Sequence, residues 1–168
     1  MLDDNDPVDI VYLDFSRAFD QVSHVKLIQK LDNLGIRGKI QRWIKSWLEN
    51  RTQYVEINGK RSETRAVKSG VPQGSVLGPL LFIVYINDLD EMIKSLVRKF
   101  ADDTKAASKV KTAADVEGFQ DCLNKMLDWS KKWAMGFNLS KCKIMHCGRN
   151  NQKAEYTMDG VKLKSVES

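Results

Sequence analysis

The sequence predicts an α+β fold, because strands and helices alternate along it while some strands pair locally as hairpins. Residues 8–14 form a short apolar run rich in β-branched and aromatic residues, as in a buried strand. Residues 112–134 instead space their apolar side chains as an amphipathic helix does. Asn58-Gly59 lies between strand-like segments, and this dipeptide favours the tight turn of a hairpin. Hairpins within a mixed order argue against a doubly wound parallel sheet.

Capping and turn signals bound the other elements. A helix is expected over 23–33, with Ser23 as its N-cap and Gly35 as its stop, and a second helix over 37–49. A glycine-rich loop follows at 69–78. The remaining expected elements are an apolar helix from Pro79 to about Asp88, strands at 96–101 and 104–108, a strand within 137–147, and a hairpin at 156–163 around Asp159-Gly160. The buried helix faces are expected to be Val25, Ile28, Leu31 and Leu34 in the first helix, and Val116, Phe119, Leu123, Met126, Leu127 and Trp133 in the helix at 112–134.

Length and composition indicate one globular domain, residues 1–168, with 42% apolar residues. No apolar run reaches the roughly 18 residues that a membrane span needs, and no signal peptide is visible, so no membrane partner is expected. The three cysteines have no framework spacing, which favours a reducing, intracellular setting.

The chain is basic, with a net charge of +5. This excess is compatible with a polyanionic partner, although many ordinary surfaces are as basic. Because the candidate catalytic residues described next are acidic, the positive charge must lie elsewhere on the surface, where it could contact phosphates.

Aspartates at the ends of two strand-like segments are the strongest functional signal. Asp14 ends the run at 8–14, and Asp102-Asp103 follow the run at 96–101. Mg²⁺ prefers oxygen ligands and leaves room for substrate phosphates, so carboxylates that converge from distant positions favour a magnesium site. Converging carboxylates would otherwise raise one another's pKa.

Other candidate sites carry less weight. Cys142, His146 and Cys147 lie close together, but they lack the partner pair that a four-coordinate zinc site needs, so we interpret them as strand and core residues. The four tryptophans, Trp43, Trp47, Trp129 and Trp133, are interpreted mostly as packing on helix faces rather than as platforms for stacked bases.

Four motifs, in order, resemble the reverse transcriptases. Residues 13–20 (LDFSRAFD) resemble motif A, residues 69–80 (SGVPQGSVLGPL) motif B, residues 100–103 (FADD) motif C, and residues 138–143 (NLSKCK) motif D. The residues of these motifs most resemble those of the enzymes of non-LTR (LINE-like, chicken-repeat or jockey-type) retrotransposons, and Asn87-Asp88 fits that branch. The resemblance covers nearly the whole chain, and four ordered motifs are far more specific than one.

The resemblance implies a polymerase palm, an antiparallel sheet with helices packed on one face, from which the fingers are largely missing and the thumb is missing. It also implies an RNA-directed DNA polymerase that adds dNTPs to a primer 3′-OH by a mechanism with two Mg²⁺ ions, for which Mn²⁺ is a possible substitute. The implied partners are an RNA template and a DNA primer. The implied location is the nucleus or a cytoplasmic ribonucleoprotein particle.

The resemblance assigns catalytic and metal-binding roles to Asp14, Asp102 and Asp103, and the backbone carbonyl of Phe15 is a further metal ligand. Neighbouring residues of a strand point to opposite faces, so Asp102 and Asp103 converge only if a turn lies there. Each also has a plain structural interpretation, since aspartates are common in turns and caps. Lys141 matches a proposed general acid for the pyrophosphate leaving group, with Lys143 as a rival and an exposed solubilising lysine as the alternative.

The remaining assigned residues would bind the nucleotide or template. Phe19 corresponds to an aromatic residue that clashes with a ribose 2′-OH, although it could equally be a core phenylalanine. Pro72, Gln73 and Gly74 belong to the motif B loop, where glycine allows the backbone to approach a nucleotide closely.

Two other functions stay open at this point. The chain could be a catalytically inactive remnant that at most binds nucleic acid, because positioning contributes about 7–11 kcal/mol to such reactions and depends on fingers and thumb. A phosphatase-like metal hydrolase is disfavoured by the pairing of motifs A and C with the Pro-Gln-Gly loop.

Overall fold

The computed structural model describes residues 6–91, 93 and 95–166. The chain divides into two compact units: Met1–Ala18 with Asn87–Ser168, here called the first unit, and Phe19–Ile86, the second unit. One domain is expected over residues 1–168, and within it residues 19–86 form a compact unit of their own. No helix of the described residues is long and apolar enough to cross a membrane.

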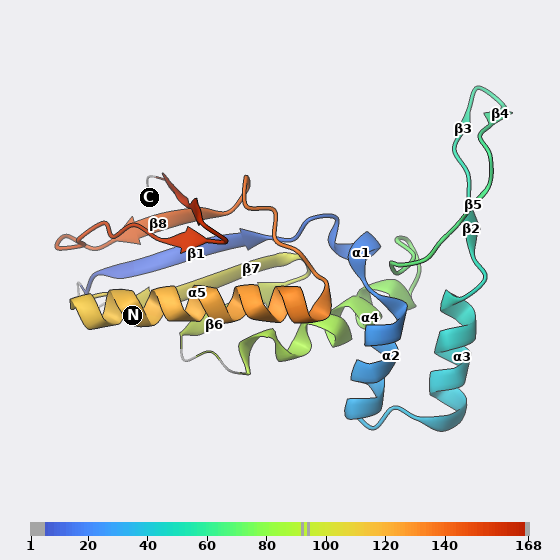
Figure 1. Cartoon of the computed structure of the whole chain (residues 1–168), viewed down its shortest axis with the longest axis horizontal. Coiled ribbons are helices and arrows are strands. Elements are labelled where there is room, and N and C mark those ends of the chain that lie inside the picture. Colours follow the sequence, from blue (N-terminus) through green and yellow to red (C-terminus); the bar gives the residue numbers. More distant parts are fainter. Residues whose placement is uncertain (1–5, 92, 94, 167–168) are drawn as a thin grey trace. The chain divides into compact units, whose positions relative to one another are not determined.

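A five-stranded sheet forms the frame of the first unit (Figure 1). Its order is β11 (Lys164–Val166), β8 (Lys143–Cys147), β1 (Val8–Asp14), β7 (Asp103–Lys109) and β6 (Leu96–Phe100). All neighbouring pairs are antiparallel except β11 with β8, which is parallel. The predicted α+β palm with an antiparallel-rich sheet is confirmed, and β11 is the strand that no sequence signal indicated.

The long helix α5 (Ala113–Trp133) runs along this sheet and packs on β7 (Figure 1). Thr112 caps it in a capping box with Asp115, and Ala134 ends it with a left-handed backbone conformation. Its buried residues are Phe119, Cys122, Leu123, Met126, Trp129, Ser130 and Trp133. The predicted inward face is largely confirmed, except that Val116 and Leu127 are only half-buried. The short helix η1 (Asn87–Asp90) adjoins α5, where Trp129 Nε1 donates to Asp88 Oδ1 at 2.8 Å.

A buried carboxylate ties the far end of β1 to the C-terminal segment. Asp9 has no exposed surface, and its carboxylate accepts hydrogen bonds from His146 Nδ1, Asn151 Nδ2 and the Tyr156 hydroxyl, each at 2.7 Å. Burial, and then the bond to Asp9, raise the pKa of the Tyr156 phenol. These three hydrogen bonds compensate the burial of the Asp9 carboxylate. They also connect β1 to β8 and to the hairpin that follows it.

That hairpin consists of β9 (Thr157–Met158) and β10 (Val161–Lys162), with positive φ at Asp159 and Gly160, as its turn sequence predicts. The strand expected within 137–147 is shorter than that range. Only β8 is a strand, because residues 138–142 form a turn in which Lys141 N and Cys142 N both donate to Asn138 O. Phe137 makes an isolated bridge to Phe15.

The second unit contains three helices, α2 (His24–Asn33), α3 (Gly38–Leu48) and α4 (Leu77–Ile86), while the short α1 (Ala18–Gln21) begins at the unit boundary. The predicted buried face of α2 is confirmed at Leu31 and wrong at Val25 and Leu34. Val25 is 81% exposed, whereas Leu27, Lys30 and Leu31 are buried. The reason is that α2 packs against both α3 and α4, and the Lys30 ammonium donates to the Tyr85 carbonyl of α4.

The two tryptophans of α3 differ in how far they are buried. Ile44 and Leu48 are buried, but Trp43 is 57% exposed and Trp47 is half-buried. The interpretation of the tryptophans as packed residues is therefore confirmed for Trp129 and Trp133 and wrong for Trp43.

A two-stranded ribbon follows α3. It pairs β2 (Thr52–Gln53) with β5 (Arg65–Ala66), and β3 (Glu56–Ile57) with β4 (Lys60–Arg61). Asn58 and Gly59 have φ of 50° and 78°, the positive values at both positions that a type I′ turn requires, so the predicted hairpin is confirmed.

The loop 69–78 is fixed at both ends. At its start, Gly70 N donates to Val22 O at 2.8 Å and Val71 N to Phe19 O at 2.9 Å. Gly70 has φ of 89°, and a Cβ there would lie 2.9 Å from Asp20 Cα, so only glycine fits. At its end, a Cβ on Gly78 would lie 2.4 Å from Pro72 O.

We expect Asp9→Ala to lower the free energy of unfolding by about 2–5 kcal/mol, because the buried Tyr156 hydroxyl and the part-buried donors of His146 and Asn151 would lose this acceptor. Urea unfolding measures this change. The exposed Asp121, which pairs with Lys125, supplies the control, since Asp121→Asn should cost less than about 1 kcal/mol. Equal losses in both variants would contradict the role given to Asp9.

Gly78→Ala should destabilise the chain by about 1–3 kcal/mol, because the added methyl group meets the backbone of Pro72. Gly118→Ala in α5 is the matched control. A Cβ there has nothing within 4 Å, so this variant should gain about 0.5–1 kcal/mol through helix propensity. Urea unfolding of both variants, with limited proteolysis of the loop, tests the difference. An unchanged midpoint for Gly78→Ala would show that the loop rearranges without cost.

Candidate active site

Two of the predicted carboxylates face one another at the end of the sheet. The register of β1 and β7 places Asp14 directly opposite Asp103, and directly opposed residues of antiparallel strands share a face. Both residues line a pocket of about 620 Å³. The other lining residues are Tyr12, Leu13, Ser140, Lys141, Lys143 and Val166. Strand pairing therefore brings together acids that are far apart in the sequence.

Asp102 lies in the turn that joins β6 to β7. Phe100 pairs with Asp103, which leaves Ala101 and Asp102 as the two turn residues, and Ala101 has a φ of 52°. The turn that Asp102 and Asp103 need in order to converge is thus present. Asp103 lines the pocket, whereas Asp102 is half-buried and is not among the lining residues.

The segment after β1 is anchored through Phe15. Its buried ring stacks on Phe137 at a centroid distance of 4.7 Å and also contacts Trp129. The adjoining backbone bonds run from Asn138 N to Asp14 O and from Ser16 N to Gly136 O. This bridge uses neither the N–H nor the C=O of Phe15, so the carbonyl proposed as a metal ligand is not consumed by it.

Lys141 brings a positive charge to the acidic end of the sheet. Its ammonium lies 3.4 Å from Asp14 Oδ2, but its side chain is 66% exposed, so the ion pair contributes little to stability. Lys143 also lines the pocket, so both candidate lysines lie at the same site. Between them, Cys142 is fully buried, and burial raises the pKa of its thiol. This thiol is a core group, as the sequence indicated.

The carboxylates supply the right atoms for a hard cation. Asp14 and Asp103 both offer oxygens to one pocket, and oxygen is the donor that Mg²⁺ prefers. In the part of the chain that the structure describes, however, no group of three or more His, Cys, Asp or Glu is placed to hold a metal ion. Of the three aspartates that are expected to converge, Asp14 and Asp103 line the same pocket, and Asp102 is not among its lining residues.

The predicted nucleotide-binding residues after Phe15 belong to the second unit. Phe19 is half-buried and stacks on Phe82 at 4.7 Å. The Pro72 carbonyl accepts from Ser75 Oγ, which in turn accepts from Gly78 N, and these bonds close the turn. Gln73 and Gly74 are exposed on the loop between these anchored positions.

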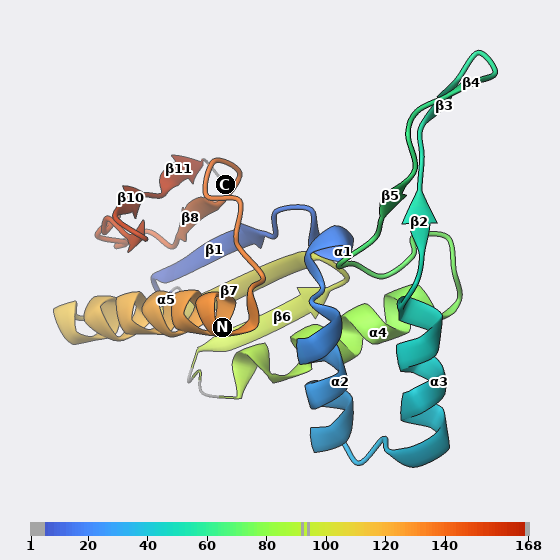
Figure 2. The ribbon, with the colours of Figure 1, turned by 45° about the vertical axis from the view of Figure 1, so that its right-hand side comes forward.

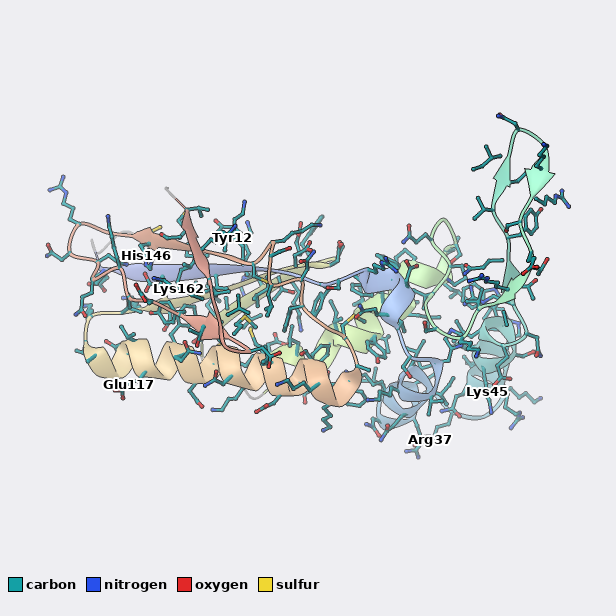
Figure 3. All side chains as sticks on the ribbon, turned by 45° about the horizontal axis from the view of Figure 1, so that its top comes forward. Tyr12, Arg37, Lys45, Glu117, His146 and Lys162 are labelled. Carbon is teal, nitrogen blue, oxygen red and sulfur yellow. The ribbon has the colours of Figure 1, made fainter. Side chains whose placement is uncertain are left out.

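Sequence reasoning missed Tyr12 and Val166 as pocket residues. Tyr12 lies on β1 (Figure 3), two residues before Asp14 and therefore on the same face, so strand periodicity could have indicated it. Lys105, its partner in the register, holds its ammonium 4.9 Å from the Tyr12 ring. Val166 lies on β11, for which the sequence carried no signal.

Comparison with known proteins gives one family. The reverse transcriptase (RNA-dependent DNA polymerase) family matches residues 8–163. The RNA-directed DNA polymerase from the mobile element jockey of Drosophila melanogaster is 36% identical over 141 residues, which are 78% of this chain and 15% of that protein. The probable RNA-directed DNA polymerase from the Drosophila melanogaster transposon X-element is 34% identical over 137 residues, with the same two coverages. The predicted resemblance to jockey-type elements is confirmed.

Solved structures agree on the fold. A telomerase from Candida tropicalis, in complex with a TWJ fragment of telomeric RNA, matches with a TM-score of 0.66 over 95% of this chain and 29% of that chain. Its sequence identity is 14%, so this likeness shows the fold alone. The chain spans about 15% of the length of the jockey and X-element proteins. With four motifs in order and a family match across nearly all its residues, the chain belongs to the reverse transcriptase (RNA-dependent DNA polymerase) family.

Proposed function

We propose that this chain is the catalytic palm segment of a retrotransposon RNA-directed DNA polymerase, which adds dNTPs to a DNA primer on an RNA template. One observation carries the proposal: Asp14 of motif A and Asp103 of motif C are opposed across paired strands at a single pocket. Carboxylates so placed are what nucleotidyl transfer requires beside a phosphate.

Divalent cations complete the proposed site. Asp14, Asp102, Asp103 and the Phe15 carbonyl would hold two Mg²⁺ ions, or Mn²⁺ in their place, which when bound neutralise charge on the attacking and leaving oxygens. The donor chemistry supports this assignment. The two opposed carboxylates would otherwise repel each other, and Lys141 offsets only part of that repulsion because it is exposed.

The protein's own groups contribute positioning and a proton. The Lys141 ammonium, which lies beside Asp14, is a donor for the pyrophosphate that leaves, and Lys143 is the alternative donor in the same pocket. Phe19 would exclude a ribose 2′-OH through its ring, which Phe82 supports from behind. The exposed Gln73 and Gly74, beside Pro72, would contact the nucleotide and template.

The proposed setting is inside the cell, in the nucleus or in a cytoplasmic ribonucleoprotein particle. Three free cysteines support a reducing environment. The other reason for this setting is that the RNA template and the DNA primer of the proposed reaction are found there.

A second candidate is a remnant that binds nucleic acid without catalysis. The observation that favours it is that no group of three acidic or other metal-ligating residues is assembled among the described residues. Retention of Asp14, Asp102 and Asp103 argues for catalysis, because clustered negative charge would weaken the binding of phosphates in a pure binder.

Single-nucleotide incorporation on an RNA template with a DNA primer tests the function. With Mg²⁺ or Mn²⁺ we expect slow incorporation, which Asp102→Ala and Asp14→Ala abolish because each removes a carboxylate of the site. Asp121→Ala, at an exposed position of α5, is the control and should keep full activity. Primer–template binding without incorporation would support the remnant instead.

Manganese binding, measured by calorimetry, tests the site without turnover. Asp14→Asn should weaken binding, since it removes a carboxylate of the pocket. Lys141→Met should strengthen it by up to about fivefold, because it removes a cation that competes with the metal. Lys125→Met, which disrupts a comparable pair with Asp121, should leave binding unchanged. Equal affinities in all four proteins would place the metal elsewhere.

A further inference from the structure

The positive charge of the chain is concentrated in α3 and the ribbon that follows it. Residues 37–68 contain nine Lys or Arg and three Glu, so this segment alone exceeds the net charge of +5 of the whole chain. The remaining residues are close to neutral. The basic excess therefore lies in the second unit, whereas the acidic pocket lies in the first.

The ribbon is exposed on both faces. Every residue from 52 to 66 is exposed, including Ile57 at 67%. In both Figure 1 and Figure 2, β2 to β5 project beyond the end of α3 as a separate arm. Because no core covers them, apolar side chains of this arm are not explained by packing within the second unit.

Aromatic rings and basic groups alternate along this surface. Arg61 lies over the Tyr54 ring at 4.7 Å, and Arg51 lies 6.0 Å from the Trp47 ring. One turn before Trp47, α3 presents the exposed Trp43. Aromatic faces interleaved with cations are the arrangement that binds single-stranded nucleic acid, through stacked bases and neutralised phosphates.

We propose that α3 and the β2–β5 ribbon form a binding surface for single-stranded RNA, here called the basic–aromatic surface. The inference rests on the proposed function in one respect: the strand that it binds is the template. Charge complementarity selects this occupant. A second copy of the chain, paired through the ribbon edge, would bring two strongly positive surfaces together at a cost.

Fluorescence anisotropy with a labelled, roughly 20-nucleotide oligouridylate measures the proposed binding directly. We expect the triple variant Lys60→Gln, Arg61→Gln, Arg65→Gln to bind more weakly and to lower the slope of log K against log salt by about 2, at about 0.7 per phosphate contact. We expect Tyr54→Ala to weaken binding by about 5- to 100-fold with little change in that slope, because it removes stacking rather than charge.

A matched triple variant controls for net charge. Lys125→Gln, Lys131→Gln and Lys162→Gln remove three positive charges from the first unit, where each lysine is paired with an acidic residue. This control should keep affinity and salt slope nearly unchanged. If both triple variants weaken binding equally, binding follows overall charge and the proposed surface is wrong.

Two further measurements separate this proposal from the proposed function. Unfolding midpoints should not change in the ribbon variants, because the altered side chains are exposed. Incorporation that is lost in Asp102→Ala, together with RNA binding that is normal in the ribbon variants, would overturn the surface and leave the polymerase proposal standing. RNA binding that depends on the ribbon, in a chain that shows no incorporation, would overturn the polymerase proposal and leave the basic–aromatic surface standing. If sedimentation shows dimers that the ribbon variants dissociate while RNA binding stays normal, the surface is a protein interface and the proposal fails.

Discussion

Pairing of β1 on both of its edges is the constraint on which the first unit depends. The strand bonds to β7 along seven residue pairs and to β8 along five, so its position fixes both neighbours. One end of β1 carries Asp9, whose buried carboxylate collects three donors from later parts of the chain. The other end carries Asp14 at the pocket. A slip of one residue would move Asp14 off the face that it shares with Asp103.

The carboxylates at the two ends of β1 have opposite environments. Asp9 is buried and satisfied, and it serves to hold β1, β8 and the C-terminal hairpin together. Asp14 is partly exposed, and its close neighbours are another carboxylate and an exposed lysine. Negative charge that stays open to solvent beside like charge is costly to stability, and a bound cation relieves that cost. Asp9 therefore has a structural role, whereas the Asp14 carboxylate remains available to bind a cation.

Local signals predicted most elements because short-range physics decides them. The turns at Asn58-Gly59 and Asp159-Gly160 adopt the positive φ values that their sequences favour. The long amphipathic pattern predicted both ends of α5 to within one residue. Contacts between elements were harder to predict. The buried face of α2 depends on α3 and α4, and Trp43 stays exposed although its spacing fits a packed face. Helical periodicity finds an apolar side without telling whether a partner covers it.

The sequence by itself determined the family, the strand that ends at Asp14 and the place of the aspartate pair between two strands, because these depend on motif order and on local backbone preference. Only the tertiary structure decided that Asp103, rather than Asp102, lines the pocket with Asp14, since strand register assigns each residue to a face. It also decided that Tyr12 and Val166 contribute to that pocket, and that the basic charge gathers on an exposed ribbon. Each of these outcomes depends on residues far apart in the chain, whose contacts no local pattern encodes.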